Sequence, residues 1–256
     1  MRQRRNGAPR AIGRPLRDKY DEDELTALYY GIGLHLGKPV TQNARGDLLG
    51  NVMNVGDPRK KSTRVYETNA YLPYHSDVSD VVGLLCLRKA KAGGLSCLVS
   101  SATIYNEMLG KHPEFLGYFY CPIYYDHMGE ELPSLTPIFS YHEGKLSSRY
   151  LRAYIELGHE RRGIPLSRVA IEALDLFDAL MNDADLRLDM MLEPGDIQFC
   201  NNYAIMHSRT HFEDFEEPAR RRKLSRLWLK MPNARTLAPD FPGRNGIPAT
   251  GAMPDF

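Results

Sequence analysis

The stretch at residues 186–206, LRLDMMLEPGDIQFCNNYAIM, places two apolar runs on either side of a turn. Residues 186–192 and 197–206 are typical of strands, and Glu193-Pro194-Gly195-Asp196 between them has the composition of a tight turn. Comparable short segments, rich in Val, Ile, Tyr and Phe and bounded by Gly, Pro or Asp, lie at 64–74, 81–87, 95–99, 118–125, 136–140 and 224–229. Many short strands predict a β-barrel or jelly roll rather than a doubly wound sheet.

Two segments have the apolar spacing of helices. Residues 21–37 begin with acidic side chains, repeat apolar residues at helical intervals, and end at Gly37. Residues 166–182 contain Ser167 as an N-cap, followed by an apolar stripe. The predicted fold class is therefore mainly β with peripheral helices.

The chain length and composition predict one folded domain. With 256 residues and 43% hydrophobic content, the chain can build a single core. We expect a basic arm at 1–20, a domain at 21–231, and a Pro/Gly-rich tail at 232–256 that is extended or partly ordered. A transit peptide is the alternative for the arm, but the first seventeen residues lack Ser, and Pro9 and Pro15 would interrupt an amphipathic helix.

The charge balance favours a small-molecule substrate. Lys and Arg number 33 against 32 Asp and Glu, so no basic field is present to attract nucleic acid or an anionic membrane. No run approaches the roughly 18 apolar residues that cross a bilayer. Four scattered cysteines suggest buried thiols in reducing cytosol, and the predicted localisation is cytoplasmic. The oligomeric state is undecided, and a homo-oligomer stays open.

The triplet His75-Ser-Asp77 is a candidate half of a metal site. In a strand or at its end, side chains two residues apart point to the same side, so one imidazole and one carboxylate can converge on a cation. Such a triplet often arises by chance, and His112-Pro-Glu114 and His211-Phe-Glu213 compete with it. The first competitor contains Pro113 and is predicted to form a turn.

A second histidine is needed, because two histidines and one carboxylate on one face of an iron leave three positions open. Both His207 and His211 qualify. His207 follows the buried-looking run 197–206, whereas His211 enters the acidic stretch 212–217, which has the composition of a solvated turn. We therefore prefer His207 to His211 as the second histidine ligand of the metal.

The composition of the basic segment 220–226 is consistent either with a solvated run of charges or with part of a binding site. On a strand, Arg222, Leu224 and Arg226 share one face, and the strand continues into the apolar residues 227–229. An inward guanidinium requires an anionic partner, and its planar fork matches a carboxylate through two parallel hydrogen bonds. A dicarboxylate co-substrate that chelates iron at its other end would supply that partner.

These motifs together resemble the taurine dioxygenase (TauD/TfdA) family of iron(II)/2-oxoglutarate dioxygenases. The resemblance covers about residues 20 to 230, and it rests on ordered motifs: His75-Ser-Asp77, Gly93-Gly-Leu-Ser96, Pro194-Gly-Asp196 leading through Asn201-Asn-Tyr-Ala-Ile-Met-His207, and Arg221-Arg222 with Arg226. It implies a double-stranded β-helix (jelly roll) with helices outside. It also implies an Fe(II) site formed by His75, Asp77 and His207.

The resemblance further implies how the co-substrate binds. Arg222, aided by the hydroxyl of Ser96, would hold the distal carboxylate of 2-oxoglutarate, and Arg226 would lie near the co-substrate and the substrate. With O2, the enzyme would convert 2-oxoglutarate to succinate and hydroxylate its substrate. Halogenating relatives lack the carboxylate ligand, so the presence of Asp77 argues against halogenation.

Two features depart from the family pattern. The taurine enzyme has an Asn four residues before its first ligand histidine, where this chain has Tyr71, with Asn69 two residues earlier on the same strand face. Taurine is therefore not the expected substrate. The sequence also begins close to the first helix, whereas many relatives have more residues before it.

Asn69, Tyr71 and Arg209 are the candidate substrate-binding residues. Arg209 shares a strand face with His207, and its alternative role is an ion pair with Asp214 or a neighbouring acid. Other polar or aromatic residues considered for the pocket are Gln42, Asn43, Tyr66 and Tyr74, although strand aromatics more often belong to the core. The mixture of Tyr and Arg suits a small polar or anionic metabolite.

Two other functions stay open from the sequence. Two histidines and an aspartate also suit a zinc hydrolase, but no additional Glu at helical spacing offers a base, and Arg222 would have no role. A non-catalytic jelly-roll binding protein is the non-enzymatic alternative. Intact His75, Asp77, His207 and Arg222 argue against it.

Overall fold

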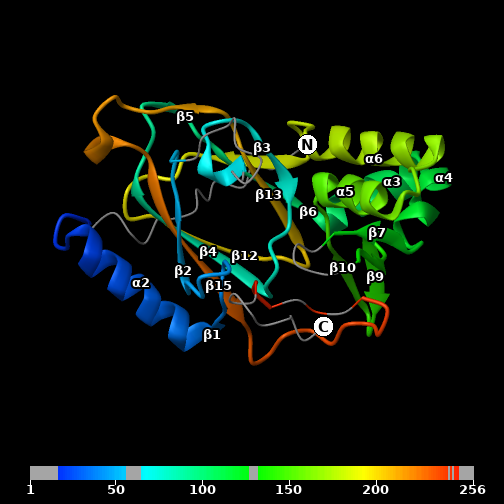
Figure 1. Ribbon diagram of the computed structural model, residues 1–256, viewed down its shortest axis with the longest axis horizontal. Helices are drawn as coiled ribbons and strands as arrows, with labels where there is room; N and C mark the ends of the chain where they lie inside the picture. The colour runs from blue at the N-terminus through cyan, green and yellow to red at the C-terminus, as the bar shows by residue number, and fades with distance from the viewer. Residues whose placement is uncertain (1–16, 56–64, 127–131, 242, 244, 248–256) are drawn as a thin grey trace, which may run out of the picture.

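Two antiparallel sheets form the body of the protein in the computed structural model (Figure 1), which describes residues 17–55, 65–126, 132–241, 243 and 245–247. The first sheet has the order β1-β15-β4-β12, with β2 also paired to β15: Lys38–Pro39 (β1), Leu49–Val52 (β2), Val81–Arg88 (β4), Ile197–Asn201 (β12) and Lys223–Lys230 (β15). The second has the order β11-β6-β13-β3: Leu72–His75 (β3), Ser96–Ser100 (β6), Arg187–Met190 (β11) and Ile205–Arg209 (β13).

Three smaller strand pairs extend the body: Ala92–Gly93 (β5) with Phe212–Glu213 (β14), Ile123–Tyr125 (β7) with Ser134–Thr136 (β8), and Phe139–His142 (β9) with Lys145–Ser148 (β10). The helices are Glu22–Leu36 (α2), Ser101–Lys111 (α3), Pro113–Leu116 (α4), Arg152–Arg162 (α5) and Arg168–Met181 (α6). Short 3-10 turns occur at Val65–Glu67 (η1), Gly117–Phe119 (η2) and Pro218–Arg220 (η3). The prediction of a mainly β protein with peripheral helices is confirmed.

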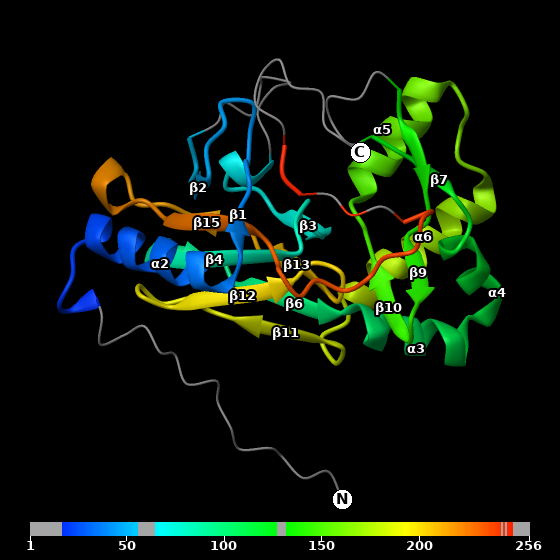
Figure 2. The same ribbon diagram turned by 90° about the horizontal axis from the view of Figure 1, so that it is seen from below.

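The two large sheets enclose a cavity, and the helices lie outside them. Side chains from β2, β4 and β15 line one side of the cavity, and side chains from β3, β6 and β13 line the other. Figure 2 shows α2 along the outer face of the first sheet, while α3 to α6 gather at the other end of the molecule. This separation leaves the space between the sheets for the candidate site.

Both predicted helices are present. Asp21 and Glu24 form a capping box at the start of α2, with the Asp21 carboxylate accepting from the Glu24 backbone N–H at 2.9 Å. Ser167 accepts from the Ala170 N–H at 3.1 Å and caps α6. α2 packs closely on β15 because Gly33 faces Leu227, and a side chain at this glycine would collide with it.

Several strand boundaries differ from the prediction. Within 64–74, only the end forms a strand, η1 covers 65–67, and Arg64 lies outside the described residues. The segment 118–125 contains part of η2 before β7, and 197–206 divides into β12 and β13 at a turn. α3 and α5 were not among the predicted helices. α5 carries mostly polar residues, and it packs through Gly158, whose close approach to the Tyr124 backbone excludes any side chain.

The segment after β15 follows an extended path that ties distant parts together (Figure 2). Arg235 donates to the Leu146 carbonyl at 2.6 Å, and Phe241 is fully buried with its ring 4.7 Å from the Arg149 guanidinium carbon. The Gly246 N–H then donates to the Val78 carbonyl oxygen at 2.7 Å. Residues 248–256 of the predicted tail and 1–16 of the predicted arm lie outside the described residues.

None of the helices in the described ranges is long and apolar enough to cross a lipid bilayer.

Replacing Phe241 by Ala should destabilise the fold. Loss of a fully buried aromatic ring costs about 3–5 kcal/mol. The free energy of unfolding, measured by urea titration, should fall by that amount. Tyr141→Ala, at a side chain that is 66% exposed, is the control and should change stability by less than about 0.5 kcal/mol. Equal stability of the two variants would contradict a packing role for this segment.

Candidate active site

Sheet register brings the two preferred histidines together. β3 and β13 pair in antiparallel fashion, and His75 lies directly opposite His207. Side chains directly opposite one another in an antiparallel pair project to the same face. The two imidazole ring centroids are 4.3 Å apart. His207 thus lies beside His75, although 131 residues separate the two in the sequence.

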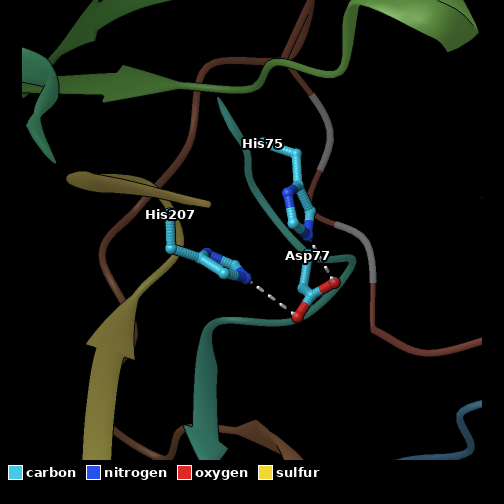
Figure 3. Close-up of side chains that lie close together, drawn as sticks. All are labelled: His75, Asp77 and His207. Carbon is cyan, nitrogen blue, oxygen red and sulfur yellow. Dashed lines mark ion pairs between the residues drawn. The ribbon is translucent and has the colours of Figure 1, made fainter. Parts of the chain in front are cut away.

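Asp77 lies just beyond the end of β3, and polar contacts fix its loop. Its backbone N–H donates to the Asn202 Oδ1 atom at 3.1 Å, and the Asn202 side chain donates in turn to the Ser79 carbonyl at 2.9 Å. The Ser76 N–H donates to the Tyr150 carbonyl at 2.9 Å. These bonds turn the Asp77 carboxylate toward the two histidines, as Figure 3 shows.

The three side chains fit a divalent metal ion. Asp77 Oδ1 lies 3.8 Å from His75 Nε2, and Asp77 Oδ2 lies 3.5 Å from His207 Nε2. One ligand atom from each residue lies within 4.8 Å of the others, and all three side chains are nearly inaccessible to solvent. Asp77 Oδ2 is buried with no hydrogen-bond partner among the described residues, as expected of an oxygen that binds a cation. Two imidazoles and one carboxylate suit iron(II).

The protonation states also suit metal binding. His75 Nδ1 lies 2.8 Å from the Pro73 carbonyl, which can only accept, so Nδ1 carries the proton and Nε2 presents its lone pair. Burial, followed by the nearby His207, lowers the pKa of His75 to about 4, so the ring is neutral near pH 7. Burial opposes ionisation of Asp77, but Arg226 and the histidines outweigh it and hold the pKa of this carboxyl well below its ordinary value.

His211 and the other competing triplet lie elsewhere. His211 is exposed and does not belong to the group of three. His112 lies between α3 and α4, but Pro113 and Glu114 form the start of α4, so the predicted turn is wrong at these two residues. The acidic stretch after His211 is not simply a solvated turn, because Phe212 is fully buried in β14, where it pairs with Gly93.

The predicted co-substrate residues share one cavity with the group of three. The lining comes from both sheets and from nearby loops, and comprises Val52, Tyr66, Leu72, His75, Asp77, Leu84, Ser96, Leu192, His207, Ser208, Arg209, Arg222, Leu224 and Arg226. A second pocket of about 170 Å³, mainly apolar and lined largely by α6 and the η2–β7 region, contains none of the predicted site residues.

Arg222 presents a buried guanidinium to this cavity. It is 5% exposed, and its guanidinium carbon lies 5.2 Å from the Phe212 ring centroid. Its NH1 nitrogen is buried with no hydrogen-bond partner among the described residues. Burial lowers its pKa to about 10, with Cys86 and Asp214 acting in the opposite direction, so the group remains charged near pH 7. Arg222 therefore fits the anionic partner that the sequence predicts.

Arg209 and Ser96 lie opposite each other where β13 pairs with β6. Arg209 donates to the Ala70 carbonyl, and its guanidinium carbon lies 4.6 Å from the Phe212 ring centroid. Burial and then repulsion from Arg222 lower the pKa of Arg209 to about 10. The Ser96 hydroxyl donates to Gln198 Oε1 at 2.8 Å. Arg209, Arg222 and Ser96 thus all line the cavity, and both guanidinium groups lie beside the Phe212 ring.

The other candidate substrate residues lie outside the cavity lining. Asn69 donates to the Phe212 carbonyl at 3.2 Å, and the Tyr71 hydroxyl donates to Asn182 Oδ1 at 3.1 Å. Gln42 and Asn43 also lie outside it, whereas Tyr66 lines it. Substrate contacts by Asn69 and Tyr71 stay predictions.

The sequence alone did not single out Phe212, Gln198 or Asn202. Asn202 lies within the motif that ends at His207, so its position could have suggested a role. Phe212 and Gln198 carried no comparable signal, because their contacts with Arg222 and Ser96 arise only from strand pairing.

A jelly-roll cavity that holds two histidines and one carboxylate is typical of mononuclear non-haem iron oxygenases. The chain belongs to the TauD/TfdA family: the family described as "Taurine catabolism dioxygenase TauD, TfdA family" matches residues 14–228.

Two curated relatives align with about four fifths of this chain. FR-33289 synthase of Streptomyces rubellomurinus (strain ATCC 31215) is 39% identical over 214 residues, which cover 80% of this chain and 63% of the relative. The taurine hydroxylase-like protein SAT17 of Stachybotrys chartarum (strain CBS 109288 / IBT 7711) is 28% identical over 222 residues, which cover 82% and 57%. The chain thus spans about three fifths of the length of these relatives.

Solved structures confirm the predicted double-stranded β-helix. Asparagine oxygenase in complex with Fe(II), 2S,3S-3-hydroxyasparagine and succinate superposes with a TM-score of 0.64 at 20% identity, covering 79% of this chain and 64% of that chain. The non-haem iron oxygenase OrfP in complex with Fe and alpha-ketoglutaric acid gives 0.59 at 16% identity, covering 80% and 64%.

Removal of the His207 imidazole should abolish tight metal binding. One of three ligands would be lost from a buried site, whereas His211→Ala, the matched control, removes an exposed imidazole. Titration of metal-free protein with Mn(II), followed by electron paramagnetic resonance, should show a Kd raised at least tenfold for His207→Ala, equivalent to at least about 1.4 kcal/mol. Equal affinities in the two variants would rule out His207 as a ligand.

Proposed function

We propose that the protein is an Fe(II)- and 2-oxoglutarate-dependent dioxygenase that hydroxylates a small polar or anionic metabolite. One observation carries this proposal: the cavity that contains His75, Asp77 and His207 also contains the buried guanidinium of Arg222. A metal triad alone has several uses. A triad together with an anion-binding arginine suits a co-substrate that has a chelating end and a carboxylate end.

The relatives support this reaction class. The asparagine oxygenase structure contains Fe(II), a hydroxylated amino acid and succinate, and an OrfP structure contains Fe and alpha-ketoglutaric acid. A further OrfP structure contains Fe, succinate and (3R,4R)-dihydroxy-L-Arg. This chain shares their fold and belongs to a dioxygenase family.

In the proposed enzyme, His75, Asp77 and His207 hold Fe(II), and Arg222 with Ser96 holds the distal carboxylate of 2-oxoglutarate. When bound with O2, the iron and 2-oxoglutarate supply the oxidising chemistry, in which 2-oxoglutarate becomes succinate and carbon dioxide as the substrate gains a hydroxyl group. Ser96 must turn its hydroxyl from Gln198 Oε1 toward the carboxylate in order to donate to it. Arg222 needs no such exchange, because its NH1 nitrogen has no hydrogen-bond partner among the described residues.

The charges in the cavity support a polar or anionic substrate. Arg209, Arg222 and Arg226 line it together with one carboxylate, that of Asp77. One carboxylate of 2-oxoglutarate would neutralise Arg222. The Nε and NH1 atoms of Arg209 are buried without hydrogen-bond partners among the described residues. Arg209 and Arg226 then favour a substrate with acceptor oxygens.

The zinc hydrolase and the binding protein are weaker alternatives. A zinc hydrolase needs the metal and an activated water, and it gives no reason to bury Arg222 beside the site. A binding protein needs no metal triad. Metal binding without consumption of 2-oxoglutarate would favour the binding protein.

Absorption spectroscopy under anaerobic conditions tests the proposal. Protein with Fe(II) and 2-oxoglutarate should show the visible metal-to-keto-acid charge-transfer band. In air, a suitable substrate should yield succinate with Fe(II) but not with Zn(II), and a chelator should abolish the activity. If folded wild-type protein shows no band, the assignment is wrong.

Arg222→Gln should weaken 2-oxoglutarate binding while retaining the band at saturation. Loss of a charge-assisted hydrogen bond costs about 1.5–3 kcal/mol, which raises the Kd by roughly 10- to 150-fold. Titration of the charge-transfer band measures this Kd. Arg221→Gln is the matched control, because the Arg221 side chain donates to the Phe215 and Glu216 carbonyls and does not line the cavity. The same Kd in both variants would exclude Arg222 as the carboxylate-binding residue.

A further inference from the structure

Gln42 is a buried amide, and two of its three side-chain hydrogen bonds go to Arg226, which lines the cavity. It lies between β1 and β2, is 1% exposed, and does not line the cavity. Its Nε2 atom donates to the Arg226 carbonyl at 2.6 Å and to the Leu48 carbonyl at 3.0 Å. Its Oε1 atom accepts from Arg226 Nε at 2.8 Å. Gln42 therefore binds both the backbone and the side chain of Arg226.

Aromatic rings restrict the same guanidinium further. The Arg226 guanidinium carbon lies 4.8 Å from the Tyr66 ring centroid and 4.4 Å from the Trp228 ring centroid. With Nε committed to Gln42, the NH1 nitrogen lies 3.7 Å from Asp77 Oδ1. Arg226 thus points toward the candidate metal centre in a fixed orientation.

This arrangement makes the two oxygens of Asp77 different. Oδ1 faces Arg226, whereas Oδ2 has no hydrogen-bond partner among the described residues and lies 3.5 Å from His207 Nε2. A guanidinium beside one carboxylate oxygen competes with a cation for that oxygen. The other oxygen remains available for the metal.

Gly50 makes the position of Gln42 sterically sensitive. It pairs with Arg226 where β2 meets β15. A Cβ atom at Gly50 would lie 2.5 Å from Gln42 Oε1, closer than two non-bonded atoms can approach. An alanine at this position would therefore displace the Gln42 amide without removing any of its polar atoms.

We propose that Gln42 is a positioning residue that fixes Arg226 against Asp77 Oδ1, so that Asp77 binds the metal through Oδ2 alone. This inference rests on the proposed function. Binding through one oxygen leaves three metal positions open beside the two histidines, whereas binding through both oxygens would occupy one of them. Gln42 acts through Arg226 and touches neither the metal ligands nor the cavity.

Three variants distinguish a positioning role from a general effect on stability. Gln42→Leu removes every hydrogen bond of the amide, and Gly50→Ala displaces the intact amide. Asn43→Ala is the control in the same loop, because the Asn43 side chain bonds to Asp47 and to the Arg45 N–H and not to Arg226.

The first readout is the absorption spectrum of cobalt(II) bound to the metal-free protein without 2-oxoglutarate. The intensity of this spectrum depends on the number of cobalt ligands. Gln42→Leu and Gly50→Ala should both change it, while Asn43→Ala should resemble the wild type. In the Fe(II) form, Gln42→Leu and Gly50→Ala should also shift the charge-transfer band and raise the 2-oxoglutarate Kd about tenfold, equivalent to about 1.4 kcal/mol.

Two results would overturn the inference. The first is a wild-type cobalt spectrum in folded Gln42→Leu or Gly50→Ala protein, with folding verified by circular dichroism. The second is an equal spectral change in Asn43→Ala and Gln42→Leu, which would assign the effect to a general disturbance of this loop. Absence of the charge-transfer band in the wild type would refute the proposed function instead, and the cobalt spectra would still test Gln42.

Discussion

The antiparallel pairing of β3 with β13 is the constraint on which the candidate site depends. It sets His75 opposite His207, and Asp77 then follows within reach of both imidazoles. Because side chains alternate along a strand, a shift of one residue would turn one histidine away from the cavity. β13 also pairs with β6, and this second register places Arg209 opposite Ser96. One central strand therefore positions residues of both the candidate metal site and the candidate anion-binding site.

Buried charge is the second constraint. Arg209, Arg222 and Arg226 are each less than a tenth exposed, and an unpaired buried charge costs several kcal/mol. Aromatic rings and backbone carbonyls offset part of that cost, as the Phe212 ring does for Arg209 and Arg222. The proposed co-substrate and an anionic substrate would supply the remaining negative charge. Binding of these anions would therefore stabilise the folded protein, because it would neutralise buried positive charge.

Sequence patterns predicted the elements that have a clear local signal. The capping box and apolar spacing of α2, the Ser167 cap of α6, and the apolar strands β4 and β15 all follow from short-range rules. α5 lacked such a signal, because its polar sequence buries only Ile155 and Gly158, and packing against β7 decides its place. The strand predicted at 64–74 was mostly wrong for a related reason: Tyr66 has strand propensity but lies in a 3-10 turn over Arg226.

The sequence by itself determined the order and chemical type of the motifs: the triplet at 75–77, the candidate histidines, the inward-facing arginines and the family they resemble. It also ranked His207 above His211, from the apolar run before it. Only the tertiary structure decided which side chains meet. It brought Arg209 into the cavity, left Asn69 and Tyr71 outside the lining, and linked Gln42 to Asp77 through Arg226. These contacts depend on strand register and burial, which arise from pairing between distant segments and leave no periodic signal in any one of them.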